Sequence, residues 1–223
     1  MGFTSPTLMK HGIFFDPPLE DNYWGHIFEE VYKSGLYQPF IPSDPKGKSV
    51  LDVGANVGVT SYFFHNKFET VYAIEPSSDH FETLTFMLNY NKITNVKPFK
   101  FALSNKDGES QFFHYGNKTM NSLYGNLGEH VAVEDVKLKR LDTFFKEEKI
   151  EHIDLLKMDC EGVEYEILCG DSFANVSDKI DAVIGEVHTF SGRDPNQIKD
   201  TLEDKGFTFN WLPHDANLFY AKK

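Results

Sequence analysis

An alternation of short apolar runs with amphipathic segments, from residue 49 to residue 205, limits the possible folds more than any other feature of this sequence. The apolar runs are rich in β-branched residues and predict buried strands at residues 49–53, 70–74, 96–101, 154–158 and 182–187. The intervening segments predict helices at residues 57–66, 77–91, 141–149, 162–169 and 196–205. Helical crossovers of this length connect parallel strands. The sequence therefore predicts an α/β fold with a doubly wound, mostly parallel sheet.

Two further strands are predicted near the C-terminus. Residues 207–212 and 217–221 are strand-like, and only residues 213–216 connect them. A connection this short suits an antiparallel hairpin and is too short for a crossover. The hairpin brings the predicted sheet to seven strands.

The segment "IPSDPKGKS", residues 41–49, divides the chain into a short N-terminal part and a main body. We predict a helical, aromatic-rich cap at residues 1–45 and a single domain at residues 46–223. Two roles for the cap remain open, because an aromatic segment can cover a substrate or pack as an amphipathic helix against the sheet.

The chain is acidic, with 34 acidic and 22 basic side chains and a net charge of -12. This charge disfavours a nucleic acid or an anionic membrane as a partner. No apolar run approaches the roughly 18 residues that a membrane span requires. Two cysteines, Cys160 and Cys169, are predicted to be reduced thiols in the core. These features predict a cytoplasmic protein.

The segment "DVGANVG", residues 52–58, follows the first predicted strand and begins the first predicted helix. Gly54 and Gly58 fit a tight turn at which the backbone approaches a ligand closely. A dinucleotide-binding turn has a glycine where this chain has Asn56, so a pyrophosphate would be crowded there. An amino acid tail fits better, with its carboxylate at the helix start and its ammonium group facing Asp52.

Glu75 ends the second predicted strand, 21 residues after Gly54. A carboxylate at this position can accept hydrogen bonds from both ribose hydroxyls of a bound nucleoside. Dehydrogenases place an acid there for the same reason, so Glu75 predicts a nucleoside without choosing between cofactors.

Six segments resemble the FkbM family of S-adenosylmethionine-dependent methyltransferases in order and spacing, over residues 48–223. They are "LDVGANVGVTS", "VYAIEPSSDHFETLTFMLNYN", "ALSNKDG", "RLDTFF", "IDLLKMDCEGVEYEILCG" and "IGEVH". The resemblance implies a Rossmann-like methyltransferase domain whose sheet ends in an antiparallel hairpin, with S-adenosylmethionine as cofactor. It also implies that Ala102 and Ser104 line the adenine pocket, although these residues also fit a surface loop.

Four polar residues follow the fourth and fifth predicted strands: Asp159, Glu161, Glu186 and His188. The carboxyl ends of parallel strands meet at one edge of a sheet, so we expect these side chains to converge on one cleft. Three acids and a histidine would repel one another there unless a cation uses them. Glu164 has two open interpretations, as part of this group or only as an acidic residue at a helix start.

Two cations are compatible with this acidic cleft. One is the sulfonium group of the cofactor, in which case His188 or a carboxylate removes the proton from the acceptor. The other is a divalent metal, Mg²⁺ or Mn²⁺, with Asp159, Glu186 and His188 as ligands.

The function predicted from the sequence is O-methylation of a hydroxyl on a small molecule or sugar. The alternatives are an N-methyltransferase, a nicotinamide oxidoreductase and a non-catalytic cofactor-binding module. "DPPL", residues 16–19, partly resembles the D-P-P-aromatic turn of nitrogen-directed DNA methyltransferases, but Leu19 departs from that pattern. Residues 116–126 are rich in glycine and asparagine and predict a loop long enough to act as a lid.

Overall fold

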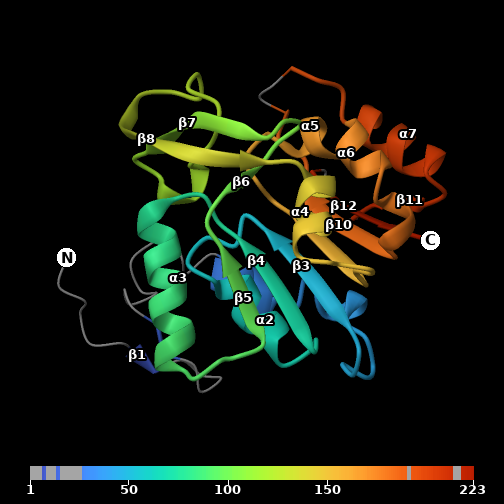
Figure 1. The fold of residues 1–223 in the computed structure, drawn as a ribbon, viewed down its shortest axis with the longest axis horizontal. Helices are drawn as coiled ribbons and strands as arrows, with labels where there is room; N and C mark the ends of the chain where they lie inside the picture. Colours follow the sequence, from blue (N-terminus) through green and yellow to red (C-terminus); the bar gives the residue numbers. More distant parts are fainter. Residues whose placement is uncertain (1–6, 9–13, 16–26, 190–191, 213–216) are drawn as a thin grey trace.

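A seven-stranded sheet forms the centre of the protein (Figure 1), whose computed structural model describes residues 7–8, 14–15, 27–189, 192–212 and 217–223. The strand order is β11-β12-β10-β9-β3-β4-β5. Five strands are parallel: β3 (Ser49–Val53), β4 (Thr70–Ile74), β5 (Val96–Phe99), β9 (Leu155–Met158) and β10 (Ala182–Glu186). The other two, β11 (Thr208–Trp211) and β12 (Leu218–Lys222), form an antiparallel hairpin beside β10. The predicted fold class is confirmed.

The helices connect the parallel strands close to the predicted positions. They are α2 (Val59–His65), α3 (Ser78–Tyr90), α4 (Leu141–Glu147), α5 (Glu164–Leu168), α6 (Asp171–Ala174) and α7 (Asn196–Asp204). Residues 162–169 were expected to form one helix, but α5 begins only at Glu164, because Glu161 and Gly162 adopt positive φ angles of 53° and 103°. A short turn of α6 then follows.

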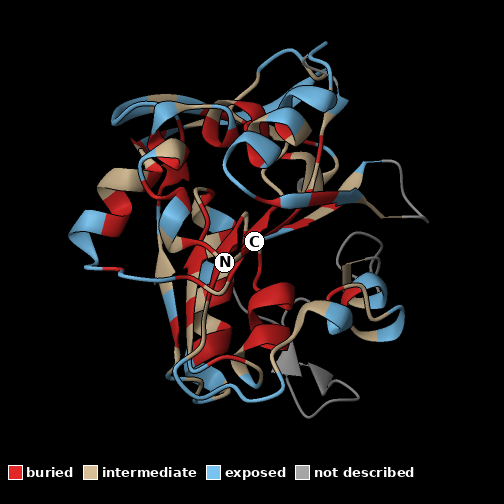
Figure 2. Cartoon of the chain, turned by 90° about the vertical axis from the view of Figure 1, so that its right-hand side faces the viewer, coloured by how far each residue is buried: buried red, intermediate tan, exposed pale blue. Residues whose placement is uncertain are grey.

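Two apolar clusters hold these layers together, and Figure 2 shows the buried residues concentrated in the sheet and on the helix faces against it. Successive residues of β3 alternate between the clusters, with Val50 in one and Leu51 in the other. The first cluster contains side chains of α2 and α3, and the second contains side chains of α4, α5, α6 and α7. A strand buried on both faces explains the continuous apolar runs in the sequence.

A second, three-stranded sheet was not predicted. It consists of β6 (Ala102–Leu103), β7 (Gly108–Tyr115) and β8 (His130–Lys139), in the order β6-β8-β7, and lies at the top of Figure 1. The first half of β8 is largely exposed, and charged residues recur from Glu134 to Lys139, so the strand lacks the apolar run that marks a buried strand. Together, Phe112, Val136 and Leu138 form a small apolar core for this sheet.

The described part of the N-terminal region contains β1 (Thr7–Leu8), β2 (Phe14–Phe15), a π-helical turn at Glu29–Lys33 and a 3-10 turn at Gln38–Phe40. Val31 and Tyr37 pack into the same apolar cluster as α2. The proposed cap boundary at residue 45 remains a prediction. The DPPL segment lies outside the described residues. No described helix is both long and apolar enough to cross a membrane.

Cys160 packs against the larger apolar cluster, as predicted, whereas Cys169 lies outside the core, contrary to the prediction. Cys160 is partly buried beside the cavity described below, and Cys169, at the end of α5, is exposed. Both are free thiols, as predicted. Cys169 follows two fully buried residues of α5, and the turn of the helix carries it away from the core.

Candidate active site

A cavity of about 310 Å³ lies at the carboxyl ends of the central strands. This volume is at the lower end of the range for small-molecule sites, roughly 300 to 1,000 Å³. The strand ends contribute Val53, Ile74, Glu75, Asp159 and Glu186, and the small sheet contributes Ala102, Leu103 and Phe112. Open α/β sheets bind ligands at this edge, so the cavity is the candidate active site.

The turn after β3 brings the backbone close to the cavity. Gly54 has a φ of +74°, and a Cβ atom on it would lie 1.8 Å from the backbone oxygen of Asp159. Asn56 also has a positive φ, 54°, which asparagine tolerates better than most residues. Its Oδ1 accepts a hydrogen bond from the Val57 N–H at 2.8 Å. The Asn56 Nδ2 has no hydrogen-bond partner among the described residues, so it remains available to a ligand.

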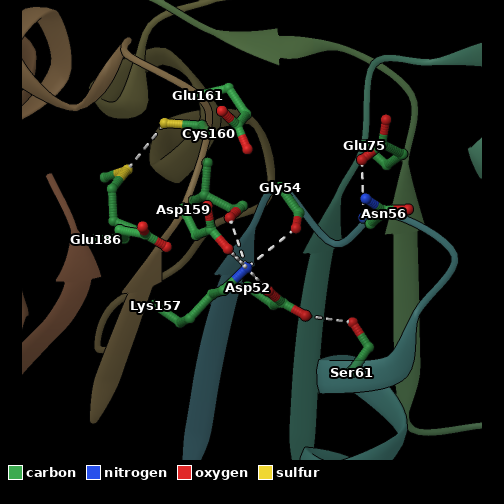
Figure 3. Close-up of polar contacts among 12 residues, drawn as sticks. Asp52, Gly54, Asn56, Ser61, Glu75, Lys157, Asp159, Cys160, Glu161 and Glu186 are labelled. Carbon is green, nitrogen blue, oxygen red and sulfur yellow. Dashed lines mark hydrogen bonds and ion pairs between the residues drawn. The ribbon is translucent and has the colours of Figure 1, made fainter. Parts of the chain in front are cut away.

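Glu75 is buried at the cavity wall, and both of its carboxylate oxygens have backbone partners. Oε2 accepts from the Asn56 N–H and Oε1 from the Ser77 N–H, each at 2.8 Å (Figure 3 shows the first). Each carboxylate oxygen can accept a second hydrogen bond, so Glu75 can still bind ribose hydroxyls. His80, which the sequence analysis overlooked, also lines the cavity, with Nδ1 3.7 Å from Glu75 Oε1.

Asp52 is placed differently from the prediction. It is fully buried and is not among the residues that line the cavity. Its Oδ2 accepts from Ser61 Oγ at 2.6 Å, and its Oδ1 lies 3.1 Å from Lys157 Nζ (Figure 3). Asp52 and Lys157 are register partners on β3 and β9, so their side chains share one face of the sheet. Asp52 therefore supports the turn and does not face the ammonium group of a ligand.

Two other predicted cofactor-binding residues also lie away from the cavity lining. Gly58 packs against α3, because a Cβ atom on it would lie 2.6 Å from Leu84 Cδ1. Ser104 is buried, and its backbone N–H donates to the Lys139 carbonyl, which extends the pairing of β6 with β8. Ala102 lines the cavity as predicted.

Lys157 is the main residue that sequence reasoning missed. Only 2% of it is exposed, and its Nζ donates to the carbonyl oxygens of Val53 at 3.2 Å and Gly54 at 3.0 Å. It lies 3.8 Å from Asp159 Oδ2. Burial alone would lower the pKa of Lys157. The charges of the Asp52 and Asp159 carboxylates raise it by more than burial lowers it, so the pKa of Lys157 lies above the usual value for lysine. The sequence did contain a signal for this residue, because Lys157 lies inside the apolar run 155–158. A lysine buried in such a strand requires a carboxylate partner.

The predicted acidic group does assemble around His188. Its Nδ1 lies 2.9 Å from Glu164 Oε1, and its Nε2 lies 3.4 Å from Glu161 Oε2 and 3.9 Å from Glu186 Oε1. Asp159 lines the same cavity. Figure 3 shows Asp159, Glu161 and Glu186 grouped at this end of the site.

Glu164 belongs to this group as well as to the start of α5. It is fully buried, and its Oε1 accepts hydrogen bonds from the backbone N–H groups of Cys160 at 3.0 Å and Gly162 at 3.2 Å. The same oxygen contacts His188. Glu164 therefore fixes both the turn before α5 and the orientation of the imidazole. Of the two interpretations that the sequence left open for Glu164, the structure favours the one in which it is part of the acidic group.

The protonation of His188 follows from these neighbours. Burial lowers the pKa of His188, but the hydrogen bond and charge of Glu164, with the charges of Glu161 and Asp159, raise it to about 10. Burial raises the pKa of Glu161 to about 8, against the opposing effect of His188. At neutral pH, His188 is therefore a cation, with the Glu164 carboxylate at Nδ1 and the carboxyl group of Glu161 at Nε2. An imidazolium has no free lone pair with which to accept a proton, so a carboxylate is the stronger of the two candidates for the general base that the sequence left open.

The site geometry changes the expected metal ligands. Single ligand atoms of Asp159, Glu161 and His188 lie within 4.8 Å of one another, whereas the predicted set had Glu186 in place of Glu161. His188 would first have to lose its Nε2 proton and its contact with Glu161. The second such group in the described chain, His152, Asp154 and Asp181, lies at the opposite ends of β9 and β10.

The segment after β7 forms one wall of the cavity, through Asn117, Thr119, Asn121 and Leu123. Ser122 Oγ donates to the Glu161 carbonyl at 2.6 Å, and Tyr124 Oη donates to Glu166 Oε1 at 2.9 Å. The predicted lid is thus a wall that is hydrogen-bonded to the turn and helix of the acidic group.

Comparison with known proteins places this site in a family. Residues 52–209 match the family model of the Methyltransferase FkbM domain. The chain belongs to the FkbM methyltransferase family. It is therefore a methyltransferase, and family membership supports the S-adenosylmethionine cofactor that the sequence predicts.

Curated relatives and a solved structure agree with this family. The chain is 29% identical to methyltransferase sdnD of Sordaria araneosa, covering 88% of this chain and 89% of that protein. It is 26% identical to methyltransferase 1 of Beauveria bassiana, covering 86% of each. The FkbM methyltransferase structure from Methylobacillus flagellatus has a TM-score of 0.56 at 14% identity, over 88% of this chain and 48% of that one.

Proposed function

We propose that this FkbM-family methyltransferase transfers the methyl group of S-adenosylmethionine to a hydroxyl oxygen of a small molecule or sugar. The observation that carries the proposal is the group of Asp159, Glu161 and Glu186 around His188, at the end of the cavity beyond the glycine turn. Carboxylates at this position can orient a hydroxyl and accept its proton as the oxygen attacks the methyl carbon.

The cavity offers contacts for the proposed cofactor at three places. Glu75 offers remaining acceptor sites for ribose hydroxyls, and Asn56 Nδ2 offers a donor for the carboxylate of the methionine end. Ala102, Leu103 and Phe112 supply an apolar surface for adenine. When bound, S-adenosylmethionine supplies an electrophilic methyl group on a sulfonium centre.

Glu161 is our proposed proton acceptor. Its carboxylate lies at the cavity wall, 3.4 Å from the His188 imidazolium, and its φ of 53° holds it in a strained conformation. Burial raises the pKa of Glu161 to about 8, so the fraction of Glu161 that is deprotonated and able to accept a proton increases as the pH rises through about 8. His188 positions this carboxylate, and Glu164 positions His188.

We keep N-methylation as the second candidate, because the same carboxylates would also hold a substrate amine. We also propose a cytoplasmic location, consistent with two free thiols, and an acceptor that is neither a nucleic acid nor a membrane, consistent with the net charge of -12.

The test combines cofactor binding with methyl transfer. Calorimetry should show binding of S-adenosylmethionine and S-adenosylhomocysteine but not NAD. Methyl-labelled S-adenosylmethionine should then be incubated with paired alcohols and amines, with products detected by mass spectrometry. We expect labelled ethers. Labelled amines without ethers would establish the N-methyltransferase instead, and tight NAD binding without a response to S-adenosylhomocysteine would overturn the cofactor assignment.

A further inference from the structure

Glu134 of β8 joins the small sheet to the start of α3. Its Oε1 accepts a hydrogen bond from the Ser78 N–H at 3.0 Å, and its Oε2 accepts one from the Ser78 hydroxyl. Oε1 also lies 2.9 Å from Nε2 of His114 on β7. Lys100 Nζ donates to Ser78 Oγ at 2.8 Å. Figure 1 shows the small sheet above this end of α3. One carboxylate therefore connects two elements that lie 56 residues apart in the chain.

The face of the small sheet that carries Glu134 also carries Phe112 to the cavity. Glu134 and Phe112 are register partners on β8 and β7, so their side chains lie on the same face. His114, two residues after Phe112, shares that face, and the two rings make an edge contact with their centroids 5.6 Å apart. Phe112 is buried and lines the cavity at the surface that we assign to adenine. Glu134 thus fastens to α3 the face that presents Phe112.

The other end of this connection lies beside the carboxylate that we assign to the ribose. The Ser77 N–H donates to Glu75 Oε1 at 2.8 Å, and the Ser77 hydroxyl caps α3 by accepting from the His80 N–H. Ser78 follows directly, as the first residue of α3. Glu75 and His80 both line the cavity. The contact between Ser78 and Glu134 therefore fixes the small sheet relative to the turn that carries Glu75.

The charge of Glu134 strengthens this connection. Burial alone would raise the pKa of Glu134. The hydrogen bonds from Ser78 and the contact with His114 lower it by more than burial raises it, so the pKa of Glu134 lies below the usual value for glutamic acid. Glu134 is therefore a carboxylate at neutral pH, and hydrogen bonds to a charged acceptor are stronger than those between neutral groups. A negative charge beside the first N–H group of a helix is also favoured by the helix dipole.

We propose that Glu134 is a positioning residue for cofactor binding. By joining β8 to α3, its carboxylate holds Phe112 at a fixed place relative to Glu75, so that adenine and ribose bind together. Glu134 is not among the described residues that line the cavity, so it acts through Phe112 and does not touch the cofactor. This inference rests on the place that the proposed function gives to adenine, and it does not depend on which acceptor is methylated.

The test is a double-mutant cycle on the affinity for S-adenosylhomocysteine, measured by calorimetry. Phe112→Ala should weaken binding by about 5- to 150-fold, the range for the loss of one aromatic contact with a base. Glu134→Ala should weaken it by about three- to tenfold, the range for one lost hydrogen bond, and by no more than Phe112→Ala does. Because Glu134 acts through Phe112, adding Glu134→Ala to Phe112→Ala should change the affinity by a further factor of about two or less.

An independent structural effect of Glu134 would instead multiply with the effect of Phe112→Ala in the double variant. Asp135→Ala is the matched control, because Asp135 is exposed and follows Glu134 on the opposite face of β8. This variant should bind S-adenosylhomocysteine within about twofold of the wild type.

Each result decides the inference. If Glu134→Ala binds S-adenosylhomocysteine with the affinity of the wild type, or if the two effects multiply in full, the inference is overturned. Wild-type affinity in Phe112→Ala would reject the proposed place of adenine, and the inference with it. If Glu134→Ala does not fold, Ser78→Ala takes its place in the cycle, because it removes the hydroxyl contact from the side of α3 and should weaken binding by about threefold. Methylation of amines only would reject the proposed O-methylation and leave this inference intact.

Discussion

The two ends of the cavity are held by different kinds of interaction. At the cofactor end, backbone N–H groups of Asn56 and Ser77 fix the Glu75 carboxylate. At the acceptor end, side-chain charges hold one another, with His188 among the carboxylates of Glu161 and Glu164. Backbone contacts form with the fold and do not titrate, whereas a charge cluster responds to pH and to the loss of a single member. Binding and chemistry should therefore be separable by mutation.

Lys157→Met should have the largest effect, because Lys157 joins the two ends through Asp52 and Asp159. The change leaves Asp52 as an uncompensated buried charge, and breaking a buried pair in this way costs about 3 to 5 kcal/mol. Urea unfolding would measure the loss. The double variant Lys157→Met/Asp52→Asn should recover part of it, and the exposed change Lys106→Met should be close to neutral. Equal losses in the single and double variants would contradict the assigned pairing.

The parallel sheet could be predicted from the sequence because its strands are buried on both faces. Residues 70–74 were predicted to form a strand and do so as β4, while the strand predicted at 96–101 ends two residues earlier at Phe99. The small sheet could not be recognised from apolar runs, since β8 is mostly exposed in its first half. The strand β8 is instead held by its antiparallel pairing with β7, which the sequence pattern does not indicate.

The acceptor end was predicted as a group, but its internal contacts were not. Asp159, Glu161, Glu186 and His188 converge because adjacent parallel strands end together. Which carboxylate contacts which ring nitrogen depends on the turn before α5, in which Glu161 has a positive φ angle that no sequence pattern indicates. The role of Asp52 was misjudged for a similar reason, because its partner Lys157 lies 105 residues away.

Glu75→Ala tests the cofactor end and should have the next largest effect. A hydrogen bond to a charged group contributes about 1.5 to 3 kcal/mol, so affinity for S-adenosylhomocysteine should fall by roughly 10- to 150-fold. Calorimetry at fixed pH would measure it. Glu203→Gln, on the exposed side of α7, is the matched control and should bind normally. If Glu75→Ala binds S-adenosylhomocysteine with the affinity of the wild type, Glu75 does not contact the ribose.

His188→Gln tests the charge of the acceptor end through pH. The folded-state pKa of His188 is raised from 6.5 to about 10, so the folded state binds this proton more tightly than the unfolded chain. Its stabilising contribution is fully present below about pH 6.5 and is lost as the pH rises through about 10. The difference in free energy of unfolding between wild type and His188→Gln should therefore shrink across this window. A difference that grows with pH would show that His188 is neutral when folded.

Chelator treatment should have the smallest effect. The His188 imidazolium already compensates the carboxylates that a divalent metal would bind. We therefore expect methyl transfer to continue at its original rate after prolonged dialysis against EDTA. Loss of activity that Mg²⁺ or Mn²⁺ restores would reverse this assignment and make Asp159, Glu161 and His188 the metal ligands.

The most direct test of the division between the two ends is Glu161→Gln, an isosteric change that removes only the proposed proton acceptor. The measurement compares single-turnover methyl transfer to an alcohol probe with the Kd of S-adenosylhomocysteine. We predict that the rate falls by about 10² to 10⁴, the usual contribution of a positioned base, while the Kd stays within about twofold of wild type. An unchanged rate, or a loss of cofactor affinity as large as that in Glu75→Ala, would contradict the assignment of chemistry to the acceptor end.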